Sequence, residues 1–127
     1  MTTASAARVV REIAAADAVV TTSLHGLVTA DAFGIPATWT VLEPPLSGGP
    51  FKFHDYESVL TPGSSRFAAF DPRMSLRDLL ASAVPAPNWT VERVCDDLER
   101  SIARLPEVLG ELPRFPRGAL GVLSGRR

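Results

Sequence analysis

Cysteine and lysine are nearly absent from this sequence of 127 residues, which has one of each, Cys95 and Lys52. A single cysteine excludes an internal disulfide framework and fits a reducing compartment. Only two histidines accompany it, and the sequence therefore contains no metal-ligand spacing. Neither a metal nor a cofactor is expected.

Long apolar runs and a strong net charge are also missing. The longest apolar candidate, Ile13–Val20, is interrupted by Asp17 and is far shorter than the roughly 18 residues of a membrane span. The net charge is −1, which predicts neither nucleic-acid binding nor attachment to a membrane surface. Hydrophobic residues make up 46% of the chain, as is typical of a globular domain.

The first 42 residues alternate between helix and strand patterns. Residues 5–16 have apolar positions at helical spacing, with Arg8 and Glu12 four apart on the polar side. The short β-branched runs 17–22 and 37–42 predict strands. Between them we expect a helix over 24–33, capped by Ser23 and ended by Gly34 and Pro36. Two strands joined by one helix predict a parallel βαβ crossover.

The remaining sequence predicts helices separated by turns. Proline and glycine make residues 43–50 a loop and residues 61–65 a turn. A strand and a helix both suit residues 51–60, and the helix is favoured. Further helices are expected over 75–83, capped by Ser75, and over 90–105, capped by Thr90. The tail after Pro113 is expected to be loose.

These elements place the chain in the α/β class, as a fragment of a Rossmann-like parallel sheet followed by C-terminal helices. Two strands do not make a sheet that buries a core on both faces. We therefore expect either a piece of a larger protein or a degenerate remnant of one.

The junction between the first strand and the next helix is the strongest candidate for chemistry. Helix N-termini offer unpaired amides, and ligands of open α/β sheets bind at the carboxyl ends of the strands. His25 lies in that first turn, beside Gly26, which would admit a close ligand. It can donate to a phosphate or act as a general acid, or it can simply hydrogen-bond the local loop.

Several other polar residues have competing interpretations. Asp31 shares an apolar helix face with Leu27, so its carboxylate must be paired or lie near a cavity. Lys52 could bind a phosphate or a carboxylate, or it could be an ordinary surface lysine above packed aromatic rings. Arg66 and Arg73 are expected to be solvated, and Cys95 is assigned no role.

Two blocks of sequence resemble the polysaccharide pyruvyl transferase family. The blocks are ADAVVTTSLHGLVTADAFGIPA (16–37) and FKFHDYESVL (51–60). Members carry an LHG segment, a small-residue helix ending in GIP, and a K-F-x-D-Y segment. The resemblance covers roughly residues 8–60. Many relatives have arginine where Ser23 stands, so a positive charge that would bind phosphate is either absent from this chain or supplied by another residue.

This resemblance implies a two-domain fold similar to GT-B glycosyltransferases, with this chain as part of the C-terminal domain. Residues 1–60 would then form a Rossmann-like transferase segment, and the residue pattern beyond it predicts a helical extension (61–112) and a flexible tail (113–127). The implied reaction transfers the pyruvyl group of phosphoenolpyruvate to two hydroxyls of a sugar, forming a ketal and releasing phosphate. An N-terminal partner domain would supply the other half of the site.

The resemblance also implies site residues. His25 would be the catalytic residue, and Ser23, Leu24, Gly26 and Lys52 would bind substrate. Two alternatives remain open from the sequence. One is a noncatalytic remnant that binds an anion, and the other is the nucleotide-sugar-binding domain of a GT-B glycosyltransferase.

Overall fold

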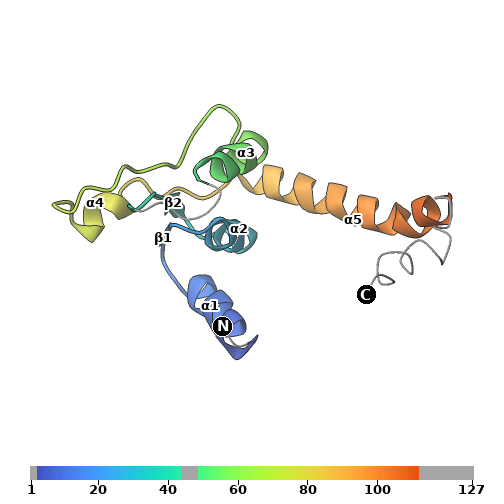
Figure 1. Ribbon diagram of the computed structural model, residues 1–127, viewed down its shortest axis with the longest axis horizontal. Coiled ribbons are helices and arrows are strands. Elements are labelled where there is room, and N and C mark those ends of the chain that lie inside the picture. The colour runs from blue at the N-terminus through green and yellow to red at the C-terminus, as the bar shows by residue number, and fades with distance from the viewer. Residues whose placement is uncertain (1–2, 44–48, 112–127) are drawn as a thin grey trace, which may run out of the picture. The chain divides into compact units, whose positions relative to one another are not determined.

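The protein is a mixed helix-and-sheet chain with a small parallel sheet and C-terminal helices (Figure 1). The computed structural model describes residues 3–43 and 49–111. Its elements are α1 (Thr3–Ala14), β1 (Val19–Thr21), α2 (Leu24–Ala32), β2 (Ala37–Trp39), α3 (Phe51–Leu60), α4 (Leu76–Leu80) and α5 (Asn88–Glu111). The chain divides into two compact units, Met1–Val94 and Cys95–Arg127.

The predicted βαβ crossover is confirmed. β1 and β2 pair in parallel, with Val19 opposite Ala37 and Thr21 opposite Trp39, and α2 connects them. Each strand is shorter than its β-branched run. The first one ends at Thr21 because the Thr21 hydroxyl accepts a hydrogen bond from the Ser23 N–H (3.0 Å) and turns the chain toward α2.

β2 has neighbours on both edges, which the sequence did not predict. Opposite β1, Trp39 forms a parallel bridge with Phe67, and Ala37 forms an antiparallel bridge with Val84. These single-residue pairings have no strand pattern of their own. They explain why every residue of β2 is buried while β1 is only half-buried.

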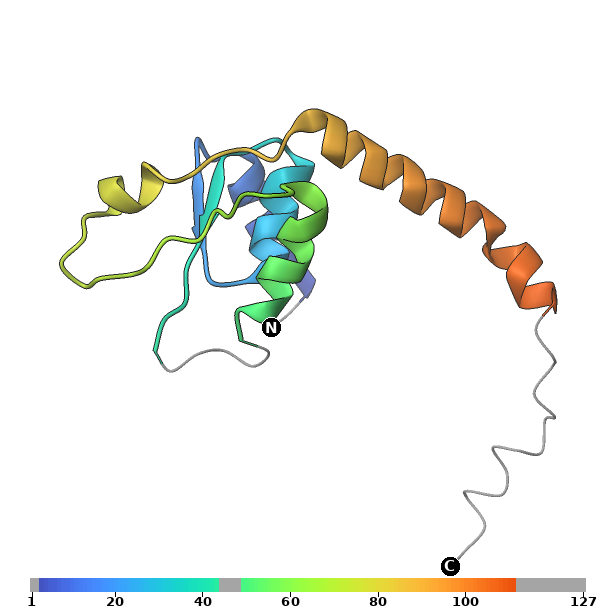
Figure 2. The ribbon, with the colours of Figure 1, turned by 90° about the horizontal axis from the view of Figure 1, so that it is seen from above.

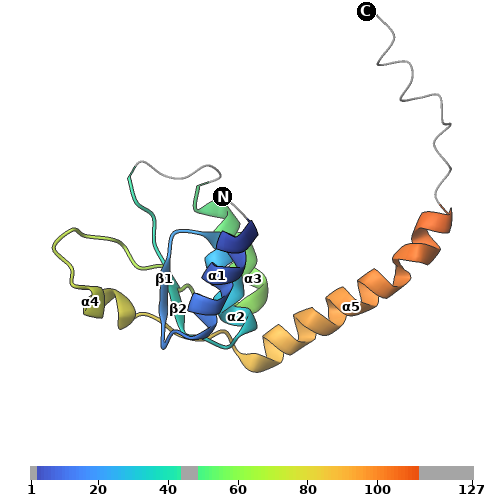
Figure 3. The same ribbon diagram turned by 90° about the horizontal axis from the view of Figure 1, so that it is seen from below.

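The core lies between the sheet and two helices. Leu27 and Ala30 of α2 and Phe53 of α3 pack against Ala37 and Trp39 of β2. The Trp39 and Phe53 rings stack with centroids 4.4 Å apart and planes 8° from parallel. Figures 2 and 3 show α2 and α3 side by side, both beginning at the carboxyl end of the strands. That edge is where open α/β sheets bind ligands.

Most predicted helices are present with shifted ends. α1 covers 3–14 rather than 5–16, and its Arg8–Glu12 pair is confirmed at 2.7 Å. Residues 51–60 are helical, as favoured. Ser75 caps α4 as predicted, in a reciprocal capping box with Asp78. The predicted loop 43–50 is described only at its two ends, and the predicted loose tail lies outside the described residues.

The prediction for the last helix was wrong at both ends. α5 begins at Asn88 and continues through Pro106 to Glu111. Thr90 does not cap it. Its fully buried hydroxyl donates instead to the Leu60 carbonyl (2.9 Å) and the Pro87 carbonyl (2.7 Å). The side chain therefore ties the start of α5 to the end of α3.

Candidate functional site

The start of α2 leaves backbone amides available at the carboxyl end of β1. Ser23 occupies the N-cap position with an extended backbone (φ −114°, ψ 129°), but its side chain makes no capping hydrogen bond. The predicted role of the Ser23 hydroxyl as a cap was therefore wrong. The first intrahelical bond runs from the Leu27 N–H to the Ser23 carbonyl (3.2 Å). Amides that precede such a bond have no partner within their helix.

His25 is the second residue of α2 and is exposed to solvent. Its carbonyl accepts a hydrogen bond from the Thr29 hydroxyl at 2.7 Å, which is an ordinary bond within the helix. The imidazole is thus carried on a regular helix turn at the edge where both strands end. A ring in this place can meet a ligand together with the amides of the first turn.

Gly26 has a packing role that the sequence did not reveal. A Cβ at this position would lie 2.5 Å from the Thr21 Oγ1 and 3.3 Å from the Thr21 Cβ. Only glycine lets the first turn of α2 approach the end of β1 this closely. This contact is sufficient to explain why glycine occupies position 26. The close ligand that the sequence suggested is not needed for that explanation.

Leu24 and Lys52 line one groove, with a volume of about 400 Å³. The groove follows α3 and is mostly apolar, and its remaining lining residues are Phe51, Asp55, Tyr56, Val59, Leu60 and Val94. Lys52 lies in the first turn of α3, half-buried, with its ammonium 5.5 Å from the centre of the Phe53 ring. Ser23, His25 and Gly26 are not among the described residues that line this groove.

Arg66 is buried, which corrects the expectation that it is solvated. Only 2% of the residue is exposed, and its guanidinium lies between two equally buried carboxylates, Asp31 of α2 and Glu57 of α3. Arg66 Nη1 donates to Asp31 Oδ1 at 2.6 Å and Nη2 to Asp31 Oδ2 at 3.0 Å. Arg66 Nε donates to Glu57 Oε1 at 3.1 Å. We call these three residues the buried ion cluster.

Further hydrogen bonds complete the cluster. The Tyr56 hydroxyl donates to Asp31 Oδ2 at 2.9 Å, and the Ser65 hydroxyl donates to Glu57 Oε2 at 2.9 Å. The Arg66 N–H also donates to Glu57, at 3.0 Å. The requirement that Asp31 be paired or lie near a cavity is thus met by a distant arginine, as well as by Tyr56.

The cluster favours the charged forms of Glu57 and Arg66. Burial by itself raises the pKa of Glu57, but the hydrogen bonds from the Arg66 backbone, Trp39, Ser65 and the Arg66 side chain together lower it below the ordinary 4.5. The Trp39 indole N–H contributes to this shift from a position that falls short of a full hydrogen bond. Burial likewise lowers the pKa of Arg66, and the two carboxylates more than offset it and raise that pKa.

Glu57 is the member that sequence reasoning missed entirely. It lies at helical spacing between Phe53 and Leu60, so a carboxylate on an apolar stripe was visible in the sequence. Arg66 gave no comparable signal, because it follows a turn and belongs to no periodic segment. Arg73, by contrast, is solvated as expected and pairs with Asp71 at 2.9 Å on the surface.

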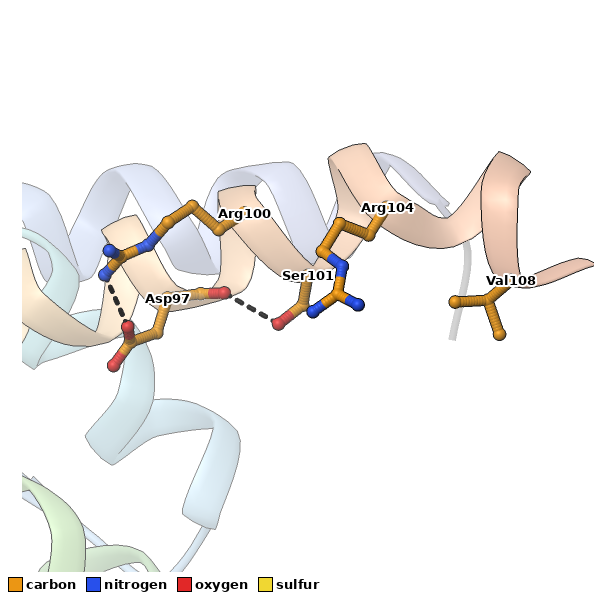
Figure 4. Close-up of a pocket in the computed structure, with 5 residues that line it drawn as sticks. All are labelled: Asp97, Arg100, Ser101, Arg104 and Val108. Carbon is orange, nitrogen blue, oxygen red and sulfur yellow. Dashed lines mark hydrogen bonds and ion pairs between the residues drawn. The ribbon is translucent and has the colours of Figure 1, made fainter.

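A second groove, of about 560 Å³, lies along α5 and is shown in Figure 4. Its charged side chains belong to one helix: Arg100 pairs with Asp97 at 2.6 Å, and the Ser101 hydroxyl donates to the Asp97 carbonyl at 2.7 Å. These are exposed contacts within the helix, and the other lining residues are Arg104 and Val108. The groove offers no described group from another element to orient a ligand.

Within 3–43 and 49–111, no group of three or more His, Cys, Asp or Glu residues could hold a metal ion. No helix in those ranges is long and apolar enough to cross a membrane.

Comparison with protein families finds a match for the part of the chain that contains the end of β1 and the start of α2. Residues 2–41 match the model of the polysaccharide pyruvyl transferase family. The family resemblance is therefore confirmed over α1, β1, α2 and β2, a stretch that includes Ser23, Leu24, His25 and Gly26. This pyruvyl transferase match lies at the N-terminal end of the chain and stops before Lys52.

The pyruvyl transferase match points to a transferase activity of that type, acting on a sugar. Comparisons with curated proteins and with solved structures give no match. The second block of the resemblance, residues 51–60, stays a prediction, and so does the GT-B-like fold.

Proposed function

We propose that this chain takes part in transferring the pyruvyl group of phosphoenolpyruvate to two hydroxyls of a sugar, forming a ketal. One observation carries the proposal: within the matched stretch, an exposed imidazole lies on the first turn of α2, at the carboxyl end of β1. Amides and an imidazole at such an edge suit an anionic donor.

The reaction defines what the site must supply. A proton adds to the methylene carbon of phosphoenolpyruvate and leaves an oxocarbenium-like centre, which one sugar hydroxyl attacks with loss of its proton. Phosphate then departs with the bonding electron pair of its C–O bond, and the second hydroxyl closes the ring and loses its own proton. Of the two hydroxyl protons, one balances the proton added to carbon and the other leaves with phosphate.

We assign His25 the proton transfer or the contact with phosphate, because an imidazole can act as a general acid or donate a hydrogen bond to an anion. The amides of Leu24, His25 and Gly26 would stabilise negative charge on the donor. Ser23 would add a hydroxyl that is not used for capping. Lys52 would add a positive charge from the first turn of α3, which begins at the same edge.

The acceptor sugar would come from the other side of the site. In the two-domain arrangement that the family implies, an N-terminal partner domain would hold the acceptor and part of the donor. We therefore place half of the active site on this chain, and we propose that it acts in the cytoplasm on a polysaccharide or its precursor.

Phosphate release tests the proposal. The chain is incubated with phosphoenolpyruvate and a galactose- or mannose-terminated oligosaccharide, alone and with the N-terminal domain of a polysaccharide pyruvyl transferase added as a separate chain. We expect phosphate release and a pyruvylated sugar by mass spectrometry in the mixture. His25→Ala should slow release by roughly 100- to 10,000-fold, the range for loss of a general acid.

The second histidine provides the matched control. His54 is also exposed but lies on α3, with its ring edge against Trp39, so His54→Ala should leave the rate unchanged. Turnover that survives in His25→Ala would contradict the assignment of His25. Binding of phosphoenolpyruvate without turnover under any pairing would favour the noncatalytic alternative, and preferential binding of a nucleoside diphosphate would favour the glycosyltransferase alternative.

A further inference from the structure

The buried ion cluster joins the two helices that carry the proposed site. Asp31 lies near the end of α2, Glu57 lies in the second half of α3, and Arg66 comes from the segment that bridges to β2. All three side chains are at most 3% exposed. Charge pairs buried to this extent are screened by salt much less than pairs on the surface.

The geometry of the cluster depends on a guanidinium. Arg66 meets Asp31 with two nitrogens and Glu57 with the third, so each of its three nitrogens donates to a carboxylate. Such a planar fork fixes both distance and orientation, which a single ammonium cannot do. The Arg66 backbone is held in turn, because its carbonyl accepts from the Thr38 hydroxyl (2.6 Å) and the Trp39 N–H (3.0 Å) of β2.

A buried ion cluster is a poor source of stability, because desolvation of the charges offsets much of their attraction. Its better-attested effect is to specify one arrangement among several compact ones. The arrangement specified here is the placement of α2 against α3. The Tyr56 hydroxyl bond to Asp31 joins the same two helices directly.

We propose that Arg66 is a positioning residue, which fixes α2 against α3. In this arrangement His25, in the first turn of α2, and Lys52, in the first turn of α3, contact the same ligand. Figures 2 and 3 show these two starts at the same end of the sheet. Arg66 itself is buried and touches no substrate. The identity of the ligand, phosphoenolpyruvate, rests on the proposed function, whereas the fixing of the two helices does not.

The test replaces the charges without leaving one of them unpaired. The triple variant Asp31→Asn/Glu57→Gln/Arg66→Met keeps acceptors for the Tyr56 and Ser65 hydroxyls and removes the ionic fork. A nitroxide label on Phe51→Cys, in a Cys95→Ser background, reports the position of the α3 start through relaxation of the Leu24, His25 and Gly26 amides. Phosphoenolpyruvate affinity is measured on the unlabelled proteins by calorimetry.

We expect the triple variant to fold, to show altered and uneven relaxation of those amides, and to bind phosphoenolpyruvate roughly 10- to 100-fold more weakly. A misplacement of about 1 Å can cost about 100-fold in reaction rate, and we expect a loss of affinity of at most that size where two helices share one ligand. Arg66→Lys, which keeps the charge but not the fork, should do the same to a smaller degree. If the triple variant does not fold, the Arg66→Lys variant tests the proposal by the same two measurements. The exposed pair provides the control, since Asp71→Asn/Arg73→Met should change neither measurement.

Unchanged relaxation and unchanged affinity in a folded variant would overturn the proposal, and so would altered relaxation with unchanged affinity. If the unsubstituted chain itself binds no phosphoenolpyruvate, the proposed function fails. The relaxation measurement then still decides whether Arg66 fixes the two helices.

Discussion

Gly26 lies where the first turn of α2 closely approaches Thr21 at the end of β1. Replacing a helical glycine by alanine normally stabilises a helix by about 1 kcal/mol. At Gly26, however, the new Cβ would lie 2.5 Å from Thr21 Oγ1, and overpacking of this kind costs about 1–3 kcal/mol. We therefore expect Gly26→Ala to lower the free energy of unfolding in urea denaturation.

Removing the obstacle should reverse the sign of that effect. In a Thr21→Ala background, the oxygen is gone, and Gly26→Ala should be neutral or stabilising relative to that background. Gly110→Ala provides a second comparison, because a Cβ at this position of α5 would have no described atom within 4 Å, apart from its chain neighbours and the backbone of its own helix. A Gly26→Ala effect that is equal with and without the Thr21 side chain would show that the close contact is not what requires glycine.

Glu57 predicts a defined pH dependence of stability. Its pKa is lowered on folding, so between the folded pKa and the ordinary 4.5 the unfolded chain binds more protons. The stability that Glu57 contributes is therefore fully present above pH 4.5 and is lost as the pH falls through the folded pKa. Glu57→Gln should destabilise the protein at pH 7, and the difference from the unsubstituted protein should shrink below pH 4.5.

Thermal unfolding measured from pH 7 downward tests this dependence. Asp71→Asn is a suitable control, because the pKa of Asp71 is also lowered, by Arg73, but the pair is on the surface. Its effect should be small at every pH. A Glu57→Gln difference that stays constant down to acid pH would contradict the account of the buried ion cluster.

At the scale of elements, the end of α3 and the start of α5 are joined by one hydroxyl. Thr90 is fully buried and donates to the carbonyls of Leu60 and Pro87. Thr90→Val preserves the side-chain volume and removes the hydroxyl that donates to the Leu60 carbonyl, whereas the Pro87 carbonyl still accepts from the Thr90 and Val91 N–H groups. We expect a loss of about 1–3 kcal/mol of stability in chemical denaturation.

Thr90→Ser keeps the hydroxyl and loses only a methyl group. It should cost less than Thr90→Val if the hydrogen bond is what matters. The reverse order would show that packing of the methyl group, and not the bond to Leu60, holds the two elements together.

Elements built from contiguous residues could be predicted from the sequence. The β-branched runs around Val19 and Thr38 predicted the parallel pair, and Ser75 before a helical pattern predicted the cap of α4. The exposed place of His25 follows from the same local pattern, since it needs only a strand that ends and a helix that begins. Such features depend on neighbours within a few residues.

Features that join distant residues could not be predicted in this way. Arg66 pairs with Asp31 across 35 positions, and no periodicity links a residue after a turn to a particular helix. The bridges from Phe67 and Val84 to β2 are single contacts without a strand pattern. For Thr90, the hydroxyl had a nearby capping role available, and the tertiary contact with Leu60 was the one that formed.

At the scale of the whole molecule, the proposed chemistry falls within one of the two compact units. The family match ends at residue 41. Helix α3, which carries Lys52, and the later residue Arg66 follow the match inside the same unit, Met1–Val94. In the proposed site, the matched stretch would supply the imidazole and the amides, whereas Lys52 would add its positive charge from beyond the match. The account therefore requires both parts to act on one ligand.

The central claim is that an anion meets the His25 imidazole and the first amides of α2. Nuclear magnetic resonance of the intact chain, titrated with phosphoenolpyruvate at constant ionic strength, tests it most directly. We predict saturable shifts of the Leu24, His25 and Gly26 amides and of the His25 ring, with the His54 ring unmoved. Shifts confined to other residues, or a His25 ring that does not respond at saturating ligand, would contradict the account.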